Sequence, residues 1–114
     1  MKVFLFIEVV FVNRASSLNR AKIMIYLFMR YRVKHYTQWK ESFDMHLASR
    51  QAGGATSQVY VMRNVGDLNE MIVLLGWQDL KTAQLFAQSI SLQMFIQNAG
   101  VLAPSEIHVL EFIF

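Results

Sequence analysis

The stretch that decides the fold is residues 23–33, which reads IMIYLFMRYRV. Successive side chains of a β-strand point to opposite sides of a sheet. Here the odd-numbered positions are mostly aliphatic, and the even-numbered ones are apolar or aromatic until Arg30 and Arg32. Residues 71–77, MIVLLGW, are equally apolar on both sides. An antiparallel sheet with helices on one face normally alternates between apolar and polar residues, so these strands require cover on both faces.

Outward from this stretch, turn residues and apolar periodicity divide the rest of the chain into strands and helices. Thr37 suits a helix N-cap, and Gly53-Gly54 suits the end of that helix. Asp79 suits the N-cap of a second helix, with Ser89 or Ser91 as a second cap within it. The polar link 64–69 predicts a hairpin loop longer than two residues. The expected strands are 23–33, 58–63, 70–77 and 106–112, the expected helices are 37–53 and 80–99, and Pro104 falls in the last connection.

The resulting order, strand-helix-strand-strand-helix-strand, is the ferredoxin-like βαββαβ plan of an α+β protein. Right-handed crossovers place the third strand between the first and second, and the first beside the fourth. The prediction is a four-stranded antiparallel sheet with both helices on one face. Its other face is apolar whichever set of positions it carries, and a large apolar patch marks an interface. We therefore expect a two-fold homodimer packed through its sheet faces, with the choice of face left open.

Length and composition restrict the class of protein. A chain of 114 residues is one domain, and 54% hydrophobic with 17% charged residues excludes disorder. Absence of cysteine removes disulfides and thiolate chemistry, and fits a reducing, cytoplasmic compartment. The net charge of +3 resides in residues 1–22, since residues 23–114 hold seven basic and seven acidic side chains. A neutral domain without a basic stripe argues against nucleic-acid binding.

Residues 1–22 form an extension ahead of the domain at 23–114. Residues 3–12 are apolar except for Glu8, a run too short to span a bilayer. One interpretation is an extra β-strand; another is a leader from an upstream start, with Met24 as the true beginning. A secretory signal cleaved near residues 15–17 is the third, and Glu8 within the apolar run weighs against it. Membrane association through this run is the weakest of the expectations.

The candidate site residues lie on one stripe of the first helix and at the end of a strand. Trp39, Phe43, His46 and Arg50 recur at helical spacing. His46 suits a general base or a haem-iron ligand, against the plainer alternative of a hydrogen-bonded structural histidine. Trp39, Phe43 and Trp77 suit a pocket for a flat aromatic substrate, or plain core. Arg50 suits an anionic group, or a surface ion pair.

The sequence lacks the residue patterns of metal binding, phosphate binding and serine hydrolysis. His35, His46 and His108 show no His-x-x-x-His or Glu-x-x-His spacing, so we expect no metal site. Gly53-Gly54 ends a helix and has no following lysine, unlike a phosphate loop. The Gly-x-Ser-x-Gly elbow of serine hydrolases is absent.

Residues 30–40, RYRVKHYTQWK, followed by Phe43-Asp44 and His46, resemble the small dimeric α+β barrel proteins related to the antibiotic biosynthesis monooxygenases. Further matching positions, within a similarity that covers about residues 24–111, are Asn69-Glu70, Trp77, Asp79-Leu80, Ala83, Phe86, Ser89, Ala99-Gly100-Val101 and Leu110-Glu111. Relatives often carry histidine where Tyr31 stands and acidic residues near His35 and Thr37. Because members include cofactor-independent and haem-degrading oxygenases, isomerases and dehydratases, this fold does not fix a reaction.

Two functions follow from these expectations. The first is a homodimeric monooxygenase without cofactor, which oxidises a small aromatic or polyketide-like substrate with His46 as base and Trp39, Phe43, Arg50 and Trp77 around it. In its haem variant His46 is the axial ligand. The second is a homodimer without catalytic activity that binds a small ligand or a partner protein.

Overall fold

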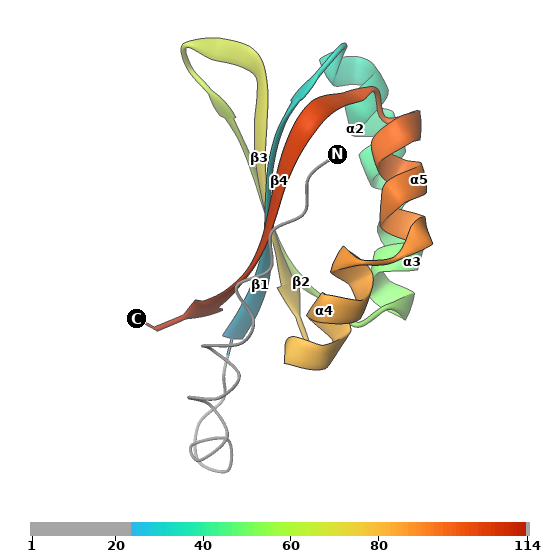
Figure 1. Cartoon of the computed structure of the whole chain (residues 1–114), viewed down its shortest axis with the longest axis vertical. Coiled ribbons are helices and arrows are strands. Elements are labelled where there is room, and N and C mark those ends of the chain that lie inside the picture. The colour runs from blue at the N-terminus through green and yellow to red at the C-terminus, as the bar shows by residue number, and fades with distance from the viewer. Residues whose placement is uncertain (1–23, 114) are drawn as a thin grey trace.

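The structure is a computed structural model that describes residues 24–113 (Figure 1). Predictions for residues 1–22, and for Ile23 as the start of the first strand, lie outside the described residues. The elements are β1 (Met24–Val33), α2 (Tyr36–Met45), α3 (Leu47–Ala52), β2 (Ala55–Asn64), β3 (Asp67–Trp77), α4 (Leu80–Ala87), α5 (Ile90–Asn98) and β4 (Val101–Phe112). No helix among them is long and apolar enough to cross a membrane.

The strands form one antiparallel sheet in the order β2-β3-β1-β4, as the crossover argument predicts. All four helices lie on the same side of this sheet, and the opposite side carries no other layer from the described part of the chain (Figure 1). The protein therefore has the expected α+β, ferredoxin-like architecture. We call the side without helices the open face.

The odd-numbered residues of β1 form the core. Ile25, Leu27, Met29, Tyr31 and Val33 are buried beneath the helices, together with the buried apolar residues of β3. Their even-numbered neighbours, from Met24 to Arg32, point to the open face and are half-buried or exposed. This settles which set of side chains faces the helices.

Several local predictions need correction. The first helix is broken at His46 into α2 and α3, and its N-cap is His35, without a side-chain cap, in place of Thr37. The β2–β3 connection is a two-residue turn, because Asn64 already pairs with Asp67. Asn64 Oδ1 accepts the Gly66 backbone N–H at 2.7 Å, so the polar link forms a tight turn at the end of longer strands.

Strand β4 begins at Val101, five residues earlier than predicted, and Pro104 lies within it. Its pairing with β1 shifts register between Arg30 and Arg32. An irregular pairing of this kind is where a strand accommodates proline, which has no N–H to donate to the ladder.

The caps of α4 and α5 follow the sequence. Asp79 and Thr82 form a reciprocal capping box at the start of α4. Of the two serines considered, Ser89 caps α5 by accepting the Leu92 N–H at 3.1 Å. Gly100 ends α5 at φ 72°, a conformation that favours glycine.

Candidate functional site

His46 occupies the break between α2 and α3 and faces the neighbouring helices α4 and α5. Its Nε2 lies 2.8 Å from Ser91 Oγ. Its ring stacks on Phe95, with centroids 5.2 Å apart, and packs at 5.7 Å from Phe86. Burial lowers the pKa of His46, the Arg50 charge lowers this pKa further, and a hydrogen bond with the backbone of Ser91 opposes both effects. The half-buried His46 is therefore neutral at pH 7 and held in place on two sides.

Arg50 is buried, although the sequence left a surface ion pair open. Its Nη1 donates to the Phe43 carbonyl oxygen at 2.7 Å, and its guanidinium carbon lies 3.9 Å from the centre of the Phe43 ring. No carboxylate of residues 24–113 forms an ion pair with Arg50. Burial accordingly lowers the pKa of Arg50, while Asp44 and Tyr31 act in the opposite direction.

Trp39 and Phe43 join Arg50 in one cluster. The two rings stack at 4.8 Å, and both are buried. Trp39 Nε1 donates to the Tyr31 hydroxyl at 2.8 Å, a contact between α2 and β1 that sequence reasoning missed. Burial raises the pKa of Tyr31 well above its ordinary range, so this hydroxyl stays protonated. The missed signal was Tyr31 itself, a polar residue on the inward side of β1.

Trp77 lies at the far end of the sheet from Tyr31, since it pairs with Ile25. It packs on Phe86 at 4.7 Å, and its buried Nε1 has no hydrogen-bond partner among the described residues. Phe86 in turn contacts His46. The structure thus unites Trp39, Phe43 and Arg50, and Phe86 lies between Trp77 and His46 and contacts both.

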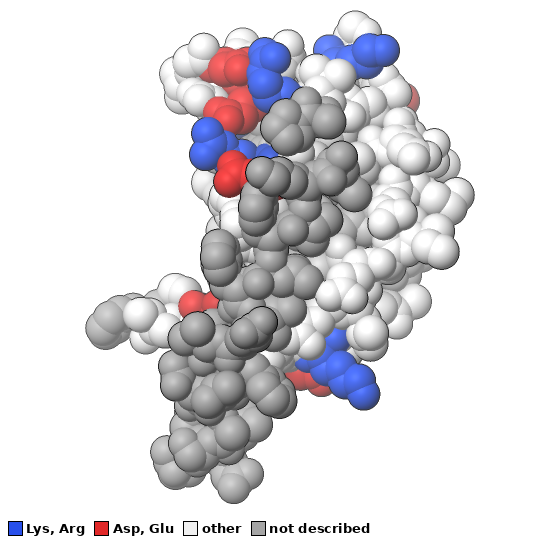
Figure 2. Space-filling view, in the orientation of Figure 1, with Lys and Arg blue, Asp and Glu red and all other residues white. Residues whose placement is uncertain are grey.

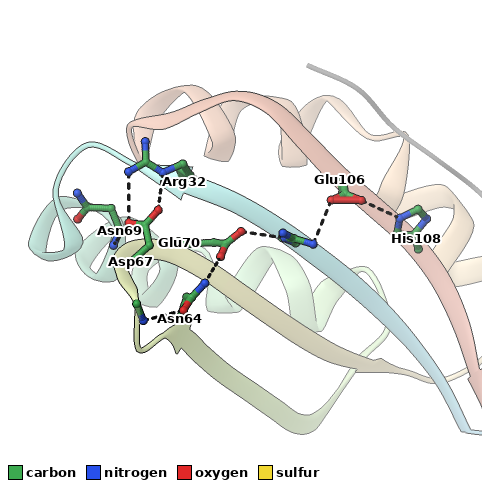
Figure 3. Close-up of polar contacts among 9 residues, drawn as sticks. Arg32, Asn64, Asp67, Asn69, Glu70, Glu106 and His108 are labelled. Atoms are coloured by element: carbon green, nitrogen blue, oxygen red, sulfur yellow. Dashed lines mark hydrogen bonds and ion pairs between the residues drawn. The ribbon is translucent and has the colours of Figure 1, made fainter.

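The open face divides into a charged end and an apolar end. At the charged end, Arg30 contacts Glu70 at 2.9 Å and Glu106 at 3.8 Å, and Arg32 contacts Asp67 at 2.9 Å (Figure 3). The chain of contacts continues from Glu70 to Asn64 and from Glu106 to His108 (Figure 3). The charges of this end are therefore largely compensated within one copy of the chain.

The apolar end of the open face contains a hollow of about 810 Å³. Tyr26 donates to Gln58 Oε1 at 2.7 Å within it. Its other lining residues are mostly apolar: Met24, Val59, Tyr60, Val61, Met62, Leu74, Leu110, Glu111 and Phe112. No group of three or more metal-ligating side chains occurs in the described part of the chain.

Fold and site together define a ferredoxin-like α+β protein with a buried arginine beneath its helices. No protein-family model and no curated protein matches the chain. Solved structures do match. A candidate antibiotic biosynthesis monooxygenase from Bordetella bronchiseptica superposes with a TM-score of 0.67 at 13% identity, covering 81% of this chain and 99% of that one.

Two further structures show the range of proteins with this fold. SnoaB, a cofactor-independent oxygenase from Streptomyces nogalater, gives a TM-score of 0.59 at 10% identity, covering 82% of this chain and 94% of its own. A protein of unknown function from Bacteroides thetaiotaomicron, a possible oxidoreductase, gives 0.55 at 16% identity, with coverages of 81% and 100%. The chain therefore has the fold of the antibiotic biosynthesis monooxygenase-like structures. At these identities the likeness establishes the fold alone.

Proposed function

We propose that this protein is a small homodimeric oxygenase that needs no cofactor and oxidises an electron-rich aromatic or polyketide-like substrate. The observation that carries the proposal is the buried guanidinium of Arg50, which has no ion-pair partner among the described residues. Burying a charged group costs several kcal/mol unless a counter-charge offsets it. A site that retains such a cation favours a substrate that becomes anionic during the reaction.

His46 supplies the base in this proposal. It is the N-cap residue of α3, four residues before Arg50, and its lowered pKa favours a neutral imidazole at pH 7. Trp39 and Phe43 provide aromatic surface beside Arg50. His46 takes the proton of a substrate hydroxyl, and Arg50 stabilises the resulting phenolate.

Dioxygen is the co-substrate and oxidant. The phenolate donates electrons from a ring carbon to dioxygen, and a carbon–oxygen bond forms to give a hydroperoxide. Loss of water then leaves a second carbonyl on the ring. One oxygen atom stays in the quinone, and the other leaves as water with the hydrogens of the original hydroxyl and ring carbon. His46 returns its proton during the loss of water.

The experiment is oxygen uptake with a panel of hydroxynaphthalenes and anthrones. We expect His46→Gln to lower the rate by about 10²–10⁴-fold, as for loss of a general base. His35→Gln is the matched control, because His35 is exposed and makes no side-chain cap. Oxygen uptake that is unchanged in His46→Gln refutes the assignment of His46 as the base. Absence of oxygen uptake by the wild type refutes the oxygenase proposal. A Soret band on haemin titration that His46→Gln abolishes replaces this proposal by its haem version.

The homodimer in this proposal forms through the open face. The exposed apolar residues there include Tyr60, Met62 and Phe112, and the charges beside them are already compensated. A face of this composition loses little charge solvation when a second copy covers it, and a standard interface buries about 1,600 Å². Sedimentation tests it: we expect a wild-type dimer at micromolar concentration and a monomer for Leu74→Arg. A wild-type monomer refutes this part.

The hollow on the open face favours a second candidate, a homodimer that binds a small apolar ligand without catalysis. Its size falls within the range of small-molecule sites, about 300–1,000 Å³. The probe is anilinonaphthalene sulfonate. We expect saturable fluorescence that Met62→Glu abolishes and His46→Gln leaves unchanged. Fluorescence insensitive to Met62→Glu refutes a site in this hollow.

A further inference from the structure

Ser91 is a polar neighbour of His46 that the oxygenase proposal leaves unused. Its Oγ lies 2.8 Å from His46 Nε2, across 45 positions of sequence. Ser91 belongs to the first turn of α5, and His46 to the break between α2 and α3. Two helix pairs thus bring a hydroxyl and an imidazole nitrogen to the separation of an activated nucleophile and its base.

The histidine of this pair has the properties that a base requires. The stacked Phe95 ring, tilted by only 16°, and the Phe86 ring restrict its orientation. Burial and the Arg50 charge favour its neutral form. A neutral imidazole with a fixed ring can accept the hydroxyl proton of Ser91 without reorganisation.

The start of α5 offers stabilisation for the charge that acyl transfer creates. The Ser89 hydroxyl oxygen accepts the Leu92 N–H of this turn, and the first N–H groups of a helix have no carbonyl partner within it. Those N–H groups and the helix dipole favour negative charge on an oxygen near Ser91. This is the requirement of a tetrahedral intermediate at a serine.

The exposed surface beside the pair is largely apolar. Met45 and Leu47, on either side of His46 in the chain, are exposed, and so are Ile90 and Met94 of α5. Helices α4 and α5 contain Lys81 as their only charged residue. Figure 2 shows the side of the molecule formed by these helices to be almost free of charge. This surface fits an uncharged, apolar acyl group.

We infer that Ser91 and His46 form a nucleophile–base pair that takes an acyl group from an uncharged apolar ester. Ser91 Oγ bonds to the ester carbonyl carbon while its proton passes to His46 Nε2. The alcohol leaves with that proton when its bond to the carbonyl carbon breaks. Water, deprotonated by His46, then releases the carboxylic acid and restores the Ser91 hydroxyl.

The experiment treats the full chain with p-nitrophenyl butyrate and with a fluorophosphonate probe. We expect nitrophenol release, and a probe adduct that peptide mass spectrometry places on Ser91. Ser91→Ala and His46→Gln each lower the labelling rate by about 100-fold or more. Ser49→Ala, a serine on the exposed side of α3, retains it. Labelling on another residue, or a rate unchanged in Ser91→Ala, overturns the inference.

Two further measurements keep the outcome clear. If Ser91→Ala fails to fold, Ser91→Cys takes its place, because cysteine retains a nucleophile at the same position. We expect this variant to be acylated, and a folded Ser91→Cys without acylation overturns the inference. Wild-type labelling without oxygen uptake refutes only the oxygenase, and uptake without labelling refutes only the acyl transfer.

Discussion

Replacing Arg50 with methionine distinguishes an arginine kept for a ligand from one kept for the fold. The substitution removes a charge-assisted hydrogen bond to Phe43 O and a contact with the Phe43 ring, which together stabilise by about 3–5 kcal/mol. It also removes the desolvation cost of a buried ion, which is on the order of several kcal/mol. The Phe43 carbonyl oxygen still accepts the backbone N–H of His46 at 3.2 Å, so this oxygen is not left unpaired.

These gains and losses nearly cancel, so we expect the free energy of unfolding of Arg50→Met to lie within about 1 kcal/mol of the wild type. The rate of oxygen uptake should fall by about 100-fold, as for loss of a group that stabilises an anion. Urea unfolding followed by circular dichroism measures the first quantity, at equal protein concentration because a dimer's stability depends on it.

Arg63→Met is the control for the Arg50 experiment. Arg63 is exposed and lies over the Tyr36 ring at 5.1 Å, so its removal should change stability by about 0.5 kcal/mol or less. A fall of more than about 3 kcal/mol in the free energy of unfolding of Arg50→Met is the size expected when a buried charge pair is broken. That result, with oxygen uptake per folded molecule unchanged, would refute the reasoning.

Three further predictions concern single contacts. Tyr31→Phe leaves Trp39 Nε1 buried without an acceptor, so unfolding free energy should fall by about 1–3 kcal/mol; an unchanged urea midpoint contradicts this. Asp79→Ala removes the capping box of α4 with Thr82 and should cost about 1 kcal/mol, against no loss in the exposed Ser49→Ala. For His46, the folded-state pKa lies below the ordinary 6.5, so between these two values the unfolded chain binds more protons. The contribution of His46 to stability is complete above pH 6.5 and declines as pH falls through that window. His46→Gln should therefore flatten this part of the stability–pH curve, and a variant curve identical to the wild-type curve excludes a lowered pKa of His46.

The apolar repeat of β1 and the order of elements were sufficient to predict the sheet order and that the helices share one face of the sheet. Local signals also predicted the Asp79 cap of α4 and narrowed the cap of α5 to Ser89 or Ser91, of which the structure has Ser89. The continuous first helix and its Thr37 cap were wrong, because helical periodicity runs through His46 without registering the break there. Periodicity reports which side chains share a face, whereas a break depends on what packs against that face.

The candidate residues were predicted from residue type and spacing, but type and spacing did not predict what surrounds these residues in the fold. Spacing put His46 and Arg50 on one helical stripe, but it gave no sign that Arg50 is buried or that His46 meets Ser91. Both facts depend on how α2 and α3 pack against α4 and α5.

By itself, the sequence determined the βαββαβ order and the antiparallel sheet, because these depend on local periodicity and chain connectivity. Only the tertiary structure decided that odd-numbered residues of β1 face the helices, and that Arg30 bridges Glu70 and Glu106 on the open face. It alone decided the Ser91–His46 contact. Each of these joins atoms from segments far apart in the chain, and the packing of the whole domain sets their distances.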